Sequence, residues 1–289
     1  MKTSIKYEYF DITKMVQSID IIEKNFNIVK LLKKTNKKAS YIVENNAGVK
    51  FFLKAKLKDF VSENEIYIYK KIKDNPHPNI NKVISLYQTD KFILILNEYI
   101  DGFYMTDSPN LHYNKFTWCA TCTDINSNII EEFDTKVDSN IDKIFNQLIK
   151  ATVHLHSLGI IHCDIKPSNV MITQNMTAIL IDYDLAKKFD HAQNILLVPK
   201  FYGTKGFISP ETAKGLIYKN SDIWNLGMLF YLYIFRNSTE QLFFYDNDEN
   251  TTSINNKLIE HYDGKYKNII NAICDMLNVS PEKRIVQFV

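Results

Sequence analysis

The chain has 289 residues, of which 45% are apolar and 24% charged, and its net charge is +2. These values are ordinary for a globular protein, and the balanced charge excludes the strongly basic proteins that hold nucleic acids or anionic membranes by charge. Four cysteines do not suggest a disulfide framework, and the longest apolar run is about half of what a membrane span needs. We therefore expect an intracellular, cytoplasmic protein without a nucleic-acid or membrane partner, and the sequence leaves its oligomeric state open.

The first hundred residues predict mainly strands. Apolar runs separated by polar turns predict short strands at 28–31, 41–43 and 49–53, and a longer run predicts another at 91–99. Residues 62–72 follow a helical pattern. This half of the chain is therefore expected to be a sheet with one helix.

The remainder of the chain predicts mainly helices. Residues 103–138 are polar and are expected to form loops, with room for one short helix, and apolar side chains at helical spacing then begin at Ile141. Two short strands are predicted at 170–172 and 179–181, and an apolar helix at 222–235. A strand-rich part followed by a helix-rich part predicts an α+β enzyme with two lobes and a cleft.

The segment from His162 to Asn169 carries the strongest chemical signal. Its carboxylate, Asp164, can orient and deprotonate a hydroxyl, Lys166 can balance phosphate charge, and the amide of Asn169 can bind a metal. A polar loop after a helix would explain Asp164 alone equally well. The complete segment favours the chemical interpretation.

A second acidic position, Asp182, directly follows the predicted strand at 179–181. A carboxylate at a strand end is well placed to hold a hard cation that bridges phosphate oxygens. Aspartate is also common in turns, so this position is informative only together with the preceding segment.

Together these segments resemble the protein kinase family, and the resemblance runs from about residue 27 to the C-terminus. Three further segments are similar to motifs of that family: 203–211 to the segment ending in Ala-Pro-Glu, 222–227 to Asp-x-Trp-x-x-Gly, and 281–284 to a late motif that ends in arginine. The resemblance implies a buried ion pair between Glu211 and Arg284.

The resemblance also implies a fold and its division. It predicts an α+β protein kinase-like bilobal fold, with a small β-rich N-lobe at 1–100, including an extension at 1–26, and a larger, mainly helical C-lobe at 101–289. Within the C-lobe it predicts an insert at 103–138, a catalytic loop at 162–169 and an activation segment at 182–211.

By resemblance, five residues of the C-lobe receive roles. Asp164 matches the catalytic aspartate and Lys166 the catalytic-loop lysine, and Asn169 and Asp182 match the metal-binding residues. Lys166 and Thr204 are typical of kinases that act on serine or threonine. We expect the hydroxyl of Thr204 to hydrogen-bond both Asp164 and Lys166.

The N-lobe is expected to bind the nucleotide. By resemblance, Lys54 holds the α- and β-phosphates with Glu65 as its helix partner, although Lys56 is a rival for the lysine position. Locally, Glu65 could equally be the last residue of a capping box. Glu98 and Ile100 lie in the segment whose backbone would bind adenine.

The sequence also departs from the family pattern. Lys33, Thr35 and Lys38 occupy the glycine positions of the phosphate-covering loop, and Phe52 replaces an alanine that lies against adenine. Cys163 replaces the arginine of His-Arg-Asp, which normally grips a phosphate on the activation segment. We therefore expect activity that does not depend on phosphorylation of that segment.

Three functions follow from these observations. The leading hypothesis is an ATP-dependent serine/threonine protein kinase that uses Mg²⁺ and acts on a protein substrate. The alternative is a pseudokinase that serves as a binding scaffold or regulator, favoured by the missing glycines. A kinase of small molecules is disfavoured by the segments similar to those that bind protein substrates.

Overall fold

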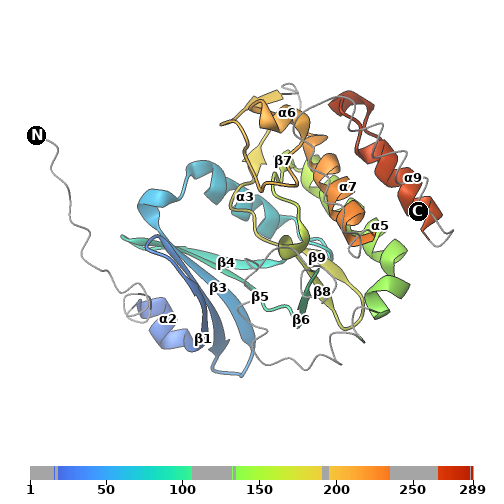
Figure 1. Ribbon diagram of the computed structural model, residues 1–289. Coiled ribbons are helices and arrows are strands. Elements are labelled where there is room, and N and C mark those ends of the chain that lie inside the picture. Colours follow the sequence, from blue (N-terminus) through green and yellow to red (C-terminus); the bar gives the residue numbers. More distant parts are fainter. Residues whose placement is uncertain are drawn as a thin grey trace, which may run out of the picture. The chain divides into compact units, whose positions relative to one another are not determined.

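The computed structural model describes residues 16, 19–105, 132, 135–190, 195–234, 266–286 and 288 (Figure 1). The chain divides into two compact units. The first comprises residues 1–74 and 82–99, and the second comprises 75–81 and 100–289. The functional division at residue 100 stays a prediction.

The first unit is built on a five-stranded antiparallel sheet with strand order β1-β2-β3-β5-β4. Its strands are β1 (Phe26–Lys34), β2 (Lys38–Asn45), β3 (Lys50–Leu57), β4 (Val83–Gln88) and β5 (Phe92–Glu98). Helix α2 (Asp20–Asn25) precedes the sheet, and the 3-10 turn η1 (Lys58–Phe60) leads into α3 (Glu63–Asp74). All four predicted strands and the helix are present, and β4 is an additional strand.

The two faces of β3 have different roles because successive side chains alternate across a sheet. Leu53 and Ala55 are fully buried in an apolar core that also contains Tyr41 and Leu94. The alternate positions, Phe52, Lys54 and Lys56, therefore point to the opposite face. One face of β3 packs into the apolar core, and the other carries the charged side chains of Lys54 and Lys56.

The second unit contains a three-stranded sheet of order β6-β8-β9. Strands β6 (Gly102–Tyr104), β8 (Val170–Thr173) and β9 (Ala178–Leu180) form it. The prediction of irregular structure is wrong for residues 103 and 104, which lie in β6, and residues 106–131 lie outside the described part of the chain. A side chain at Gly102 would bring Cβ to 2.4 Å from the carbonyl oxygen of Ile172, so only glycine permits this pairing.

Three helices form the core of the second unit, in which α7 contacts both α5 and α9 (Figure 1). They are α5 (Ile141–Ser157), α7 (Ser221–Ile234) and α9 (Lys267–Met276). The rings of Phe145 and Phe230 meet edge to face, with centroids 4.6 Å apart. The predicted helices at 141 and 222 are confirmed, and no helix in the described part of the chain is long and apolar enough to cross a membrane.

The segment between β9 and α7 is less helical than predicted. Its strand β10 (Lys187–Lys188) pairs with β7 (Ile160–Ile161), and β11 (Ile195–Leu197) pairs with β12 (Leu216–Tyr218). Among the described residues of this segment, only α6 (Pro210–Ala213) is helical. Short 3-10 turns complete this unit at η3 (Pro167–Asn169) and η4 (Pro281–Lys283). The β10–β7 pairing joins the segment to the start of the loop that follows α5, and the β11–β12 pairing lies within the segment.

Candidate active site

A buried carboxylate on α7 holds the backbone of the loop at 162–169. Asp222 has no exposed surface, and its two oxygens accept the backbone N–H groups of His162 and Cys163, each at 2.8 Å. The ring of His156 on α5 lies 2.8 Å from the same carboxylate. Hydrogen bonds to a buried charged group are among the stronger ones, so Asp222 fixes where the loop begins.

The backbone at Cys163 adopts a left-handed conformation, with φ of +67°, which is uncommon for a residue other than glycine. The N–H group of Cys163 and that of His162 both point to Asp222, which accounts for the turn. Burial, followed by the charge of Asp222, raises the pKa of the Cys163 thiol well above its usual value, so the thiol stays protonated. It packs against Phe189 and Ile217. Apolar contacts therefore occupy the position where the family has an arginine.

Four side chains meet in a hydrogen-bonded network within the second unit. Thr204 Oγ1 donates to Asp164 Oδ1 at 2.6 Å and accepts from Lys166 Nζ at 2.6 Å. Lys166 Nζ also lies 2.7 Å from Asp164 Oδ2. The amide of Asn169 donates to Asp164 Oδ2 at 3.1 Å and to its carbonyl oxygen at 2.8 Å. The contacts predicted for Thr204 are therefore present.

Asn169 and Asp182 lie at the same end of the β8–β9 hairpin. Asn169 precedes β8, Asp182 follows β9, and the N–H of Ile181 donates to the carbonyl oxygen of Asn169 at 2.9 Å. Since the amide nitrogen of Asn169 donates to Asp164, its amide oxygen is the atom left to face a cation. Asp182 has a left-handed backbone with φ of +64°.

This pair fits a cation that also binds phosphate oxygens. Carboxylate and amide oxygens are the ligands that Mg²⁺ prefers, and Mg²⁺ usually takes only one or two protein side chains together with phosphates. Within the described ranges, no group of three or more His, Cys, Asp or Glu side chains forms a metal site of its own. The donor set therefore suits a nucleotide-bound metal better than a structural metal.

In the first unit, Glu65 pairs with Lys56. Lys56 Nζ lies 2.5 Å from Glu65 Oε1, and both side chains are less than a tenth exposed. Ser62 Oγ also accepts the N–H of Glu65 at 3.2 Å, so the expected helix cap is present as well. Lys54 lies two residues earlier on the same face and is 6% exposed. The ion pair with Lys56 was anticipated only as the rival to Lys54.

The two residues expected beside adenine lie at the end of β5 and just beyond it. The side chain of Glu98 is exposed, and its N–H donates to the carbonyl oxygen of Lys82 at 2.9 Å. The contact of Glu98 with adenine stays a prediction. Ile100 is 9% exposed and belongs to the second unit.

Comparison with known proteins decides the family. A family model described as protein kinase domain matches residues 25–287. The chain belongs to the protein kinase family. The family and the α+β protein kinase fold predicted from the sequence are thus confirmed. Membership implies ATP, a divalent cation and protein substrates in general terms.

The curated relatives of this kinase domain are distant. It is 26% identical over 274 residues to the serine/threonine-protein kinase cds1 of Schizosaccharomyces pombe, covering 90% of this chain and 53% of the relative. It is 32% identical over 174 residues to the serine/threonine-protein kinase ppk6 of the same yeast, covering 60% and 19%. It is 29% identical over 173 residues to sperm motility kinase Z of Mus musculus, covering 59% and 29%. The chain thus spans about a fifth to a half of these relatives' length.

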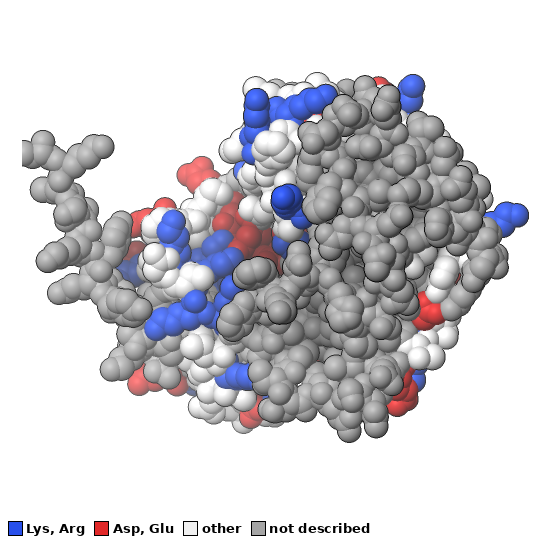
Figure 2. Space-filling model, viewed as in Figure 1, with Lys and Arg blue, Asp and Glu red and all other residues white. Residues whose placement is uncertain are grey.

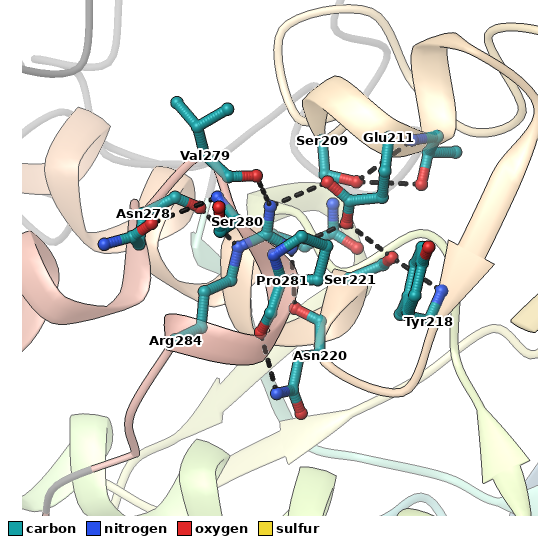
Figure 3. A network of polar contacts seen from close by, with 12 residues as sticks. Ser209, Glu211, Tyr218, Asn220, Ser221, Asn278, Val279, Ser280, Pro281 and Arg284 are labelled. Atoms are coloured by element: carbon teal, nitrogen blue, oxygen red, sulfur yellow. Dashed lines mark hydrogen bonds and ion pairs between the residues drawn. The ribbon is translucent and has the colours of Figure 1, made fainter. Parts of the chain in front are cut away.

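The ion pair predicted between Glu211 and Arg284 is present in the kinase domain (Figure 3). Arg284 Nη1 and Nη2 donate to the two oxygens of Glu211 at 2.6 and 2.7 Å. Ser221 Oγ also donates to the Glu211 carboxylate at 2.7 Å. Arg284 further donates to backbone carbonyls, including that of Asn220. The pair thereby joins α6, the start of α7 and the C-terminal turn η4.

Two features of the kinase domain were not predicted as functional contacts. Asp222 was recognised only as part of a motif, because the backbone N–H groups it accepts leave no mark in the sequence. The pairing of Glu65 with Lys56 was not preferred because Lys54 and Lys56 share one face of β3. The alternation of side chains along β3 could have placed both lysines near α3, but it does not indicate which of them pairs with Glu65.

Glu211→Gln should destabilise the kinase domain at neutral pH by about 3–5 kcal/mol, because it leaves the buried Arg284 without its partner charge. Burial alone would raise the pKa of the Glu211 carboxyl, but the hydrogen bonds and charge of Arg284 outweigh it and lower the pKa below its usual 4.5. A lowered folded-state pKa stabilises the fold above the unfolded pKa, and this contribution is lost as the pH falls through the folded pKa.

Urea unfolding of the wild type and Glu211→Gln from neutral to acid pH measures this difference, which should shrink below about pH 4.5. The exposed Glu282→Gln is the matched control and should change stability by no more than about 0.5 kcal/mol. Equal stability of Glu211→Gln and Glu282→Gln would contradict the structural role of the pair.

Proposed function

We propose that the chain is an active serine/threonine kinase that transfers the γ-phosphoryl group of ATP to a protein hydroxyl with Mg²⁺. The observation that supports this most directly is the network of Asp164, Lys166, Thr204 and Asn169. In this network the carboxylate of Asp164, the ammonium group of Lys166 and the hydroxyl of Thr204 lie within hydrogen-bonding distance of one another. Phosphoryl transfer to a hydroxyl needs a carboxylate and a positive charge close together in this way. A protein used only for binding has no physical need for this arrangement.

The roles follow from the network. Asp164 accepts the proton of the incoming hydroxyl and aims its oxygen, and Thr204 fixes the carboxylate from one side. Lys166 offsets the negative charge that accumulates on the transferred group. Asn169 and Asp182 hold Mg²⁺, which neutralises phosphate charge when it is bound. Positioning and fixed charge supply most of the rate increase.

In the first unit, the proposal assigns the nucleotide phosphates to Lys54. The charge of Lys56 is already balanced by Glu65 at 2.5 Å. Lysine is a mobile point charge suited to phosphate. Glu98 and Ile100 would contribute backbone groups to adenine.

A specific observation favours the alternative, a pseudokinase that acts as a scaffold. The turn between β1 and β2 is closed by Thr35, whose Oγ1 accepts the N–H groups of Lys37 and Lys38 at 3.2 and 3.1 Å. Glycines would leave such N–H groups to phosphates. Phe52 adds bulk on the face of β3 that carries Lys54. Nucleotide binding is therefore the step on which the two functions differ.

Asp164→Ala and Asp182→Ala should each lower phosphoryl transfer by at least about 10²-fold, because one removes the hydroxyl-orienting carboxylate and the other a metal ligand. Incubation with radiolabelled ATP, Mg²⁺ and a generic protein substrate measures this. The exposed Asp90→Ala is the control and should retain wild-type labelling. Undiminished labelling in Asp164→Ala would contradict the proposal, and an unlabelled wild type that binds no ATP would support the scaffold.

Lys54→Met and Lys56→Met should have separable effects. Lys54→Met should abolish the rise in melting temperature that Mg²⁺-ATP gives the wild type by mass action. Lys56→Met should itself cost about 3–5 kcal/mol, because it leaves Glu65 buried without its partner.

The double variant Lys56→Met/Glu65→Met serves as the control, and it should recover most of that loss because no unpaired charge remains. Differential scanning fluorimetry with and without Mg²⁺-ATP makes these comparisons. A neutral Lys56→Met combined with a strongly destabilising Lys54→Met would reverse the assignment.

A further inference from the structure

The residues beside the catalytic network border the position of a substrate hydroxyl. Thr204 is bonded to Asp164, and a Cβ on Gly203 would lie 3.1 Å from the carbonyl oxygen of Cys163. The hydroxyl of Tyr202 donates to the carbonyl oxygen of Leu185 at 3.0 Å. Gly203 and Thr204 therefore lie against the catalytic loop, and Tyr202 ties the preceding backbone to Leu185. With Asp164 orienting the substrate hydroxyl as proposed, the flanking residues of a substrate would pass close to the residues before and after this segment.

This segment is strongly basic. The whole chain is nearly balanced, with 35 Lys and Arg against 33 Asp and Glu. Between residues 185 and 219 only two acids occur, and one of them, Glu211, is neutralised by Arg284. The same span carries six lysines: Lys187, Lys188, Lys200, Lys205, Lys214 and Lys219. The imbalance sets this segment apart from the nearly neutral chain as a whole.

Five of these lysines are exposed. The sixth, Lys187, is half-buried and places its ammonium 4.9 Å from the ring centre of Tyr202. Figure 2 shows basic side chains gathered at the top of the view, over the part of the second unit where Figure 1 draws α6. Lys200 and Lys205 flank the held backbone directly. In the chain, an exposed lysine therefore lies four residues before Thr204 and another directly after it.

Apolar side chains lie between these lysines. Phe201 is 59% exposed and has a left-handed backbone with φ of +58°. Leu197, at the end of β11, is 84% exposed. A left-handed conformation is unfavourable for an aromatic residue, and such strain is common at binding sites. The surface beside the network thus offers aromatic and aliphatic contacts within a positive field.

We infer that the substrates are proteins whose serine or threonine lies next to acidic side chains and a large apolar side chain. Asp or Glu residues of the substrate would pair with Lys200 and Lys205, and the apolar residue would contact Phe201. This inference rests on the proposed function for the transfer step, but the recognition of acidic peptides does not require catalysis. The complementary charge would act mainly on binding and on the rate of encounter.

The test uses serine peptides that differ only in their flanking charges, carrying Glu, Lys or Ala beside a common Phe. The Glu peptide should be phosphorylated with a kcat/KM about 10-fold or more above that of the Lys peptide, and the preference should fall with added salt. Lys200→Glu and Lys205→Glu should each raise KM for the Glu peptide about 3- to 10-fold and lower it for the Lys peptide.

Lys267→Glu is the matched control, because Lys267 is an exposed lysine on α9 of the same unit and its reversal changes net charge equally. It should leave the peptide preference unchanged. Thermal unfolding verifies that all variants are folded. If Lys200 or Lys205 had only a structural role, its substitution would raise KM for both peptides alike. The inference instead requires KM to rise for the Glu peptide and to fall for the Lys peptide.

Fluorescence anisotropy with a labelled Glu peptide whose serine is replaced by alanine measures peptide binding separately from phosphoryl transfer. Binding that is lost in Lys200→Glu, without phosphorylation of any peptide, would uphold the inference and reject the kinase activity. Phosphorylation that favours the Lys peptide, or that ignores Lys200→Glu and Lys205→Glu, would overturn the inference while upholding the activity. Absence of both binding and phosphorylation would overturn the inference.

Discussion

The buried carboxylate of Asp222 is the constraint on which the catalytic loop depends. It accepts two consecutive backbone N–H groups, from His162 and Cys163, and a hydrogen-bonding contact from His156. A carboxylate without exposed surface is costly unless it is fully bonded, so these contacts are strongly specified. The direction in which Asp164 leaves the loop follows from this anchoring. The network around Asp164 is thus built on a side chain from a helix distant in sequence.

Besides the anchoring by Asp222, the second unit has apolar contacts around Cys163, at the position where the protein kinase family has a charged arginine. The protonated thiol of Cys163 packs against Phe189 and Ile217, and β10 and β11 pair with β7 and β12. These contacts join parts of the segment at 182–211 to neighbouring strands and apolar side chains. Independence from phosphorylation of this segment stays a prediction. Lys188, Lys200 and Lys205 of the same segment are exposed.

The sequence predicted the contacts whose residues belong to recognisable short motifs. The contacts of Thr204 with Asp164 and Lys166 and the pair of Glu211 with Arg284 were predicted from motifs and are present. It did not predict β6, β10, β11 and β12, because strands of two or three residues depend on distant partners more than on their own composition. It favoured Lys54 over Lys56 as the partner of Glu65, whereas the ion pair in the structure is with Lys56; alternation places both lysines on one face of β3 and cannot distinguish them.

A crystal structure of the chain with Mg²⁺ and a non-hydrolysable ATP analogue tests the central claim most directly. The account predicts Mg²⁺ bound to the amide oxygen of Asn169 and the carboxylate of Asp182, with the phosphates near Lys54 and the carboxylate of Asp164 beside the terminal phosphate. Phe52 filling the space of adenine, or a metal bound away from Asn169 and Asp182, would contradict it.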